Sequence, residues 1–214
     1  MRALTTNGLG RLTAAVRIVL GAVFVINGLN WWVKLIDPYP SISDFATQPP
    51  PNNIAGALIA TGFLFHIVKG MELGAGVLLL ANRFTPLALV LSMPVTVIVF
   101  FVDVVIATRL RPHLMGTGAM LMSIFLMLAY FRFFAPILAF RAPPDGPLAT
   151  GETSAPPIRL GALNPHATRA GRMAVAGLGI VSLLLGLVML VWLGVMIVQH
   201  FTATTGGFQA SRHA

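Results

Sequence analysis

The chain has 214 residues, of which 57% are hydrophobic and only 9% are charged. Soluble domains carry about 25% charged residues, so this chain has too few polar groups to cover a surface in water. It contains no cysteine. This excludes disulfide redox chemistry, thiolate catalysis and cysteine-ligated metal or iron–sulfur sites within the chain.

The net charge of +8 comes from 14 basic residues, most of which flank apolar segments. Basic residues at the ends of apolar segments are typical of membrane proteins. The sequence shows no basic helix and no aromatic platform on which bases would stack. We therefore predict a lipid bilayer as the surroundings of the chain and no nucleic-acid partner.

Five apolar segments are each long enough to cross a bilayer, which takes about 20 helical residues. The first segment resembles a signal peptide, but no small-residue cleavage site follows it. It ends instead in Asn30-Trp31-Trp32-Val33-Lys34, an aromatic and basic anchor typical of a membrane interface, so we predict a retained helix. The predicted spans are 12–36, 54–81, 84–108, 114–138 and 173–198.

The segments between the spans are polar or short. Residues 37–53 are rich in proline, which lacks a backbone donor, and are placed outside the hydrocarbon. Asn82-Arg83 forms a tight turn, so spans two and three should be an antiparallel hairpin. The predicted fold is an all-α membrane protein with an antiparallel four-helix transmembrane bundle and a fifth transmembrane helix. Its parts are the bundle (1–140), a flexible Pro/Gly-rich linker (141–171), the fifth helix (172–200) and a loose tail (201–214).

The distribution of basic residues predicts the orientation in the membrane. With the N-terminus in the cytoplasm and the C-terminus in the periplasm, seven arginines lie on the inner side. Arg109 and Arg111 lie on the outer side and oppose this assignment. The inner set is Arg2, Arg11, Arg83, Arg141, Arg159, Arg169 and Arg172.

Polar and ionisable residues inside spans are expensive and are candidates for function. His66, Lys69 and Glu72 are spaced three residues apart, so they share one helix face, which should point into the bundle. Counting about 1.5 Å per residue makes a buried cluster of Arg17, Glu72 and Arg132 feasible. The complete candidate set for a ligand site or buried polar cluster is Arg17, Asn27, His66, Lys69, Glu72, Asp103 and Arg132.

Each of these residues also has a structural explanation. A buried carboxylate paired with a cation fixes how helices pack, and Lys69 and Glu72 can pair along their own helix. His66 is either a hydrogen-bonded interior histidine or a ligand contact. It is the one histidine well inside a span, so bis-histidine haem ligation and a metal site are not predicted. Pro94 is either a tolerated kink or frees a carbonyl that faces a cavity.

The fifth span contains no charge and carries a stripe of small residues, which let helix backbones approach closely. This helix should pack against the bundle, a second copy or a partner subunit. The stripe consists of Ala176, Gly179, Ser182, Gly186 and Gly194.

Several stretches resemble the DoxX-like family of small bacterial integral membrane proteins. They are Arg17 to Asn30, Thr61 to Arg83, Pro94, and Ala129 to Arg132 with Pro136, so the resemblance covers about residues 12–140. It implies a compact four-helix bundle in a bacterial inner membrane and a link to membrane redox systems, including a subunit of a thiosulfate:quinone oxidoreductase. Asp103 departs from the family, whose members often have a histidine late in span three. The linker and fifth helix are also additions.

Three functions are consistent with this pattern. The first is an accessory or anchor subunit of a quinone-linked membrane oxidoreductase, with other subunits or a second copy contacted through helix 173–198. The second is binding of a quinone, a lipid or another small molecule by the buried polar cluster. The third, a small transporter, is less favoured because one short bundle shows no internal repeat. No catalytic residue, metal or intrinsic cofactor is predicted.

Overall fold

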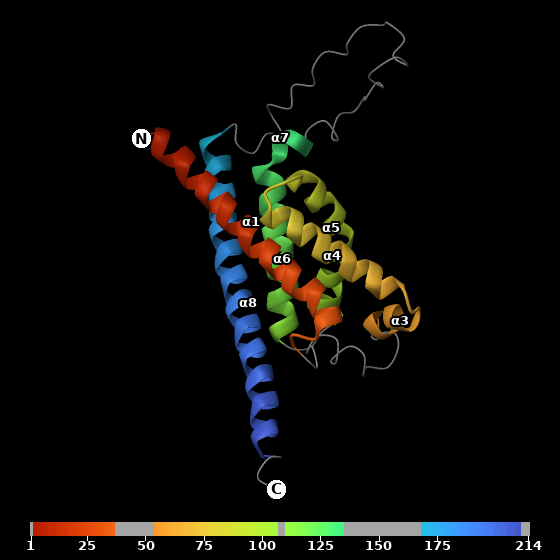
Figure 1. Cartoon of the computed structure of the whole chain (residues 1–214). Helices are drawn as coiled ribbons and strands as arrows, with labels where there is room; N and C mark the ends of the chain where they lie inside the picture. Colours follow the sequence, from red (N-terminus) through yellow and green to blue (C-terminus); the bar gives the residue numbers. More distant parts are fainter. Residues whose placement is uncertain (1, 37–53, 107–109, 135–167, 211–214) are drawn as a thin grey trace, which may run out of the picture.

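The computed structural model describes residues 2–36, 54–106, 110–134 and 168–210, and within these ranges it contains helices and no strand (Figure 1). The predicted loop 37–53 and most of the predicted linker 141–171 lie outside the described residues. The helices are α1 (Arg2–Val33), α3 (Ile54–Ala60), α4 (Leu64–Leu80), α5 (Thr85–Phe101), η1 (Val102–Ile106), α6 (Leu110–Ala129), α7 (Phe131–Phe134) and α8 (Arg169–Ala210).

Four helical stretches have the length and apolar composition needed to cross a membrane, namely Gly8–Val33, Thr85–Ile106, Leu110–Ala129 and Arg169–Ala203. The fifth long helix, α4, is apolar too, with 17 residues. The chain is therefore an all-α, multi-pass membrane protein, as the sequence predicts. Helix α8 is longer than predicted, because it includes residues 201–210, which were expected to be a loose tail.

The prediction of one continuous helix over residues 54–81 was wrong. The chain leaves the helix between α3 and α4, where Gly62 has φ of 78°, a conformation that glycine adopts without a steric cost. The Thr61 hydroxyl donates to the Leu58 carbonyl at 2.7 Å and accepts from the Leu64 amide at 3.1 Å. One side chain thus bonds to both helices at the break and fixes the short α3 as a separate element.

The third and fourth spans also depart from their predicted ends. Helix α5 contains Pro94 and continues into η1, a single π-helical segment that includes Asp103. Leu110, predicted to follow the third span, instead begins α6, with Pro112 in the first turn where its missing amide costs nothing. Helix α6 ends at Ala129 and is followed by the one-turn α7.

Helices α1 and α4 cross closely because glycines form their contact. A Cβ atom built on Gly28 would lie 2.8 Å from the Leu73 amide nitrogen, and one on Gly76 would lie 2.8 Å from the Gly21 carbonyl oxygen. These distances leave no room for a side chain between the two backbones. The pairs run in opposite directions along the two helices, so α1 and α4 are antiparallel.

Helix α8 packs on the bundle through much of its predicted small-residue stripe. Gly179 lies against Leu12 of α1 and Phe125 of α6, and Gly186 lies against Val19 and Met122 of the same two helices. From Leu12 to Val19 and from Gly179 to Gly186 the step is seven residues in the same direction, so α1 and α8 are parallel, as Figure 1 shows. The buried stripe is Val175, Gly179, Ser182, Gly186, Met189 and Leu193.

Ser182 has a testable effect on stability. Its side chain is fully buried, and no partner lies within hydrogen-bonding distance of its Oγ in the described part of the chain. Leaving a buried hydroxyl unsatisfied costs about 1–3 kcal/mol. Ser182→Ala is therefore expected to raise the melting temperature in nanodiscs by about 2–4 °C, which corresponds to roughly 1 kcal/mol. Ser123→Ala is the matched control, because the Ser123 hydroxyl donates to the Ala119 carbonyl at 2.9 Å. Equal losses of stability in both variants would contradict this assignment.

Candidate ligand-binding cavity

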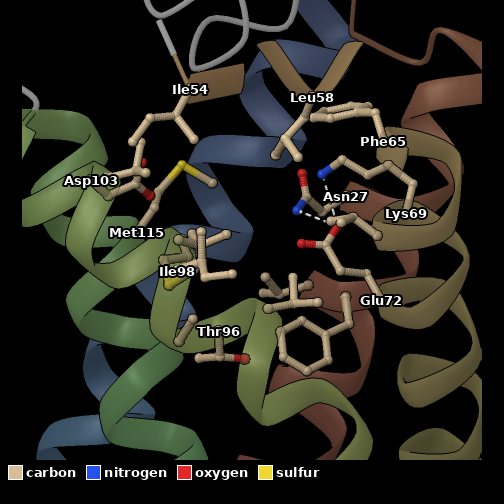
Figure 2. A pocket seen from close by; sticks show the side chains of 18 residues that line it. Asn27, Ile54, Leu58, Phe65, Lys69, Glu72, Thr96, Ile98, Asp103 and Met115 are labelled. Atoms are coloured by element: carbon tan, nitrogen blue, oxygen red, sulfur yellow. Dashed lines mark hydrogen bonds and ion pairs between the residues drawn. The ribbon is translucent and has the colours of Figure 1, made fainter. Parts of the chain in front are cut away.

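A cavity of about 190 Å³ lies in the middle of the bundle, and seven helical segments contribute to its walls (Figure 2). For comparison, an engineered apolar cavity of about 150 Å³ binds benzene. Most of the wall is aliphatic or aromatic, and the polar side chains stand on two opposite sides. The lining residues are Val23, Phe24, Asn27, Ile54, Leu58, Phe65, Val68, Lys69, Glu72, Val95, Thr96, Ile98, Val99, Val102, Asp103, Met115, Ala119 and Met189.

Three polar side chains meet on one wall of the cavity. Glu72 Oε2 accepts hydrogen bonds from Lys69 Nζ at 2.8 Å and from Asn27 Nδ2 at 2.9 Å. Lys69 and Glu72 are buried and lie one helical turn apart on α4, whereas Asn27 comes from α1. The Lys69 ammonium group also lies 5.4 Å from the centre of the Phe65 ring. Lys69 and Glu72 therefore form an ion pair on α4, and Asn27 links this pair to α1.

Asp103 faces this group from the other side of the cavity (Figure 2). It comes from η1, and π-helical turns inside α-helices occur frequently at functional sites. Gly116 of α6 makes room for it, because a Cβ atom on Gly116 would lie 2.7 Å from the Asp103 Cβ. The second oxygen of the Glu72 carboxylate points into the space between the two walls (Figure 2).

The predicted cluster of Arg17, Glu72 and Arg132 was wrong. Arg17 is buried, but its guanidinium group donates to the carbonyl of Leu79, near the end of α4. Arg132 is exposed and lies with its guanidinium carbon 5.3 Å from the centre of the Phe133 ring. Glu72 instead pairs with Lys69 of its own helix, which needs no long side chain to reach across the bundle.

The prediction that His66 shares the inward face of α4 was also wrong. The buried stripe of α4 runs through Phe65, Lys69, Glu72, Gly76 and Leu79. His66 follows Phe65 and is therefore rotated about 100° away from the stripe, which leaves it exposed. Its ring lies 5.4 Å from that of Trp31 and 6.4 Å from that of Trp32.

Four of the seven predicted site residues thus line one cavity: Asn27, Lys69, Glu72 and Asp103. The sequence did not indicate the aliphatic and sulfur-containing walls, which include Leu58 of α3 and Met189 of α8. Within the described ranges, no group of three His, Cys, Asp or Glu residues is arranged to hold a metal ion.

Residues 12–104 match the family model DoxX. The match begins in α1 and ends in η1, so it contains the four predicted site residues that line the cavity. It stops short of residue 140, and the resemblance over residues 105–140 stays a prediction. No curated protein and no solved structure matches the chain. Residues 12–104 of this multi-pass membrane protein are therefore similar to the DoxX family.

Proposed function

We propose that this protein binds a small amphiphilic molecule in the cavity of its helix bundle. The observation that carries the proposal is the combination of a mostly apolar space with polar groups on two facing walls. Ligand pockets commonly combine apolar walls with a few well-placed polar groups that orient the ligand. The apolar body of the ligand would contact residues such as Phe24 and Val95, and its polar head would lie between Glu72 and Asp103.

The alternative is that the ion pair of Lys69 and Glu72 only fixes the packing of α1 against α4. A purely structural pair does not need open space beside it. The cavity beside Glu72 and the separate carboxylate of Asp103 favour a ligand. Quinones and lipid fragments are amphiphilic molecules of a size that such a site accepts.

A variant that fills the cavity tests the proposal. Ala119 is buried and lines the cavity on α6. Ala119→Leu adds three heavy atoms to this space and is expected to weaken binding of a short-chain ubiquinone analogue at least tenfold, about 1.4 kcal/mol. Binding is measured by titration of the protein in nanodiscs, with mass spectrometry of co-purified lipids as a second readout. Ala174→Leu, on the exposed side of α8, is the matched control. Unchanged binding and unchanged lipid content in Ala119→Leu would refute the proposal.

A role as an accessory subunit of a membrane oxidoreductase is the second candidate. One face of α8 is covered by the chain's own bundle, whereas Ile180, Leu184, Leu187 and Val191 are exposed. An oxidoreductase partner would contact this aliphatic face, and the face is expected to be covered by lipid when no partner is bound. Native-gel electrophoresis after mild detergent extraction tests this role. A solitary chain without a co-purifying protein would exclude it.

The orientation with the N-terminus in the cytoplasm of a bacterial inner membrane is part of the same proposal. Because α1 and α8 are parallel, both helices begin on the same side of the membrane. The start of α8 carries Arg169 and Arg172, and the positive-inside rule places these residues in the cytoplasm.

A further inference from the structure

The ionisable side chains that line the cavity carry unequal numbers of positive and negative charges. Within the described ranges they are Lys69, Glu72 and Asp103. The ammonium group of Lys69 is paired with Glu72 at 2.8 Å, which uses the one cation of the set. The ionised cavity therefore carries one negative charge more than it neutralises, and Asp103 is the source of that charge.

Asp103 is buried and points into the cavity, with 6% of its surface exposed (Figure 2). In the part of the chain that the structure describes, no donor lies within hydrogen-bonding distance of its carboxylate. Taking an unpaired carboxylate out of water is unfavourable by several kcal/mol unless a counter-charge accompanies it. A buried carboxyl group of this kind either takes up a proton or pairs with a cation. Because Asp103 faces open space, a cationic molecule inside the cavity would supply the counter-charge of its ionised form.

The wall of the cavity opposite Asp103 would also attract a positive charge. The Glu72 oxygen that does not bind Lys69 points into the cavity (Figure 2). Phe24 and Phe65 add aromatic rings to the lining, and aromatic faces attract cations. A neutral ligand such as a quinone would bind mainly through its apolar contacts and less tightly than a cation, and an anion would be repelled by the two carboxylates.

We propose that the amphiphile bound in this cavity has a cationic head group, an ammonium or amidinium, held by Asp103 opposite Glu72. This inference rests on the proposed binding function and defines the chemical class of its ligand. The ammonium donates a hydrogen bond to Asp103 on the side of the cavity that faces Glu72, while the apolar body lies against the aliphatic wall. A cavity of about 190 Å³ accommodates a single aromatic ring with a short aminoalkyl arm.

Three probes with the same aromatic body and different heads test this charge preference. They are 2-phenylethylamine, 2-phenylethanol and 3-phenylpropanoate, titrated onto the protein in phosphatidylcholine nanodiscs, so that the lipid surface does not attract the cation. A ligand that binds the folded state raises the melting temperature by mass action. We expect a saturable rise with the amine, an apparent Kd at least tenfold higher for the alcohol, and no rise with the carboxylate.

Variants of Asp103 identify the group responsible. Asp103→Asn is expected to reduce the preference for the amine over the alcohol to less than twofold, whereas Asp103→Glu keeps the charge and is expected to retain the preference. If Asp103→Asn does not fold, Asp103→Glu and the wild-type preference still decide the question. Arg132→Gln, an exposed charge change outside the cavity, is expected to leave all three titrations unchanged.

The experiments distinguish a failure of the proposed cation preference from a failure of the proposed binding function. Equal binding of the amine and the alcohol, sensitive to Ala119→Leu, would mean that Asp103 is protonated and would overturn the cation preference alone. Retention of the preference in Asp103→Asn would likewise overturn it. If none of the three probes bound saturably and the ubiquinone analogue also failed to bind, the binding function itself would be refuted.

Discussion

Replacing Gly76 with valine is expected to lower the free energy of unfolding by about 3 kcal/mol or more, because it forces α1 and α4 apart. A Cβ atom at this position would lie 2.8 Å from the carbonyl oxygen of Gly21 and 2.8 Å from the amide nitrogen of Val25. Both atoms belong to the backbone of α1 and cannot rotate away. Overpacking of a closed interface typically costs 1–3 kcal/mol, and valine adds two methyl groups beyond this Cβ.

The unfolding of Gly76→Val is measured by titration with sodium dodecyl sulfate, next to Gly74→Val as the control. Gly74 lies two residues earlier on the same helix, and a Cβ there meets nothing within 4 Å. Both variants carry the same change in helix propensity, so their difference isolates the contact with α1. Equal losses of stability would show that α1 and α4 do not pack through Gly76.

Breaking the buried ion pair is expected to have the second large effect. Lys69→Met leaves the Glu72 carboxylate with only the amide of Asn27 as a partner. Removing one member of a buried pair typically costs 3–5 kcal/mol, because the remaining charge is uncompensated. We expect a loss of about 3 kcal/mol in Lys69→Met. Most of it should be recovered in the double variant Lys69→Met/Glu72→Gln, in which neither charge remains.

A double-mutant cycle provides the measurement. The free energies of unfolding of Lys69→Met, Glu72→Gln and the double variant are compared with that of the parent, and Arg132→Met serves as an exposed control. Coupled residues give an interaction energy of about 0.5–3 kcal/mol in such a cycle. Additive losses in the two single variants would show that Lys69 and Glu72 act independently.

Much of the fold follows from the sequence, because lipid imposes simple rules. A long apolar run with basic or aromatic ends has to be a helix of membrane length. The same rules led us to miss the break between α3 and α4, because they treat a long apolar run as one helix. Glycine is common inside transmembrane helices, so Gly62 within an apolar run did not indicate a turn. The left-handed φ of Gly62 is a property of the folded backbone. Amino-acid composition does not distinguish such a glycine from a helical one.

Only part of the candidate site was predicted, because some of its contacts lie within one helix and others join two helices. The three-residue spacing of Lys69 and Glu72 indicated that they can pair, since this pairing depends on one helix only. The partner from α1 depends on how far the two helices slide along each other. In the structure, Arg17 bonds to the carbonyl of Leu79, and this offset brings Asn27 to the level of Glu72. The offset is set by the glycine contacts between α1 and α4, and no count along a single helix contains it.

The position of Met189 changes how the fifth helix is understood. The family match ends at residue 104, yet Met115 and Ala119 of α6 and Met189 of α8 line the same cavity as the matched residues. A fragment that ended before residue 168 would keep Asn27, Lys69, Glu72 and Asp103 but lose Met189, the residue of α8 that lines the cavity. The residues that line the cavity therefore extend beyond the residues that match the family model. Under the proposed binding function, we expect the shorter fragment to bind the same probes less tightly than the full chain does.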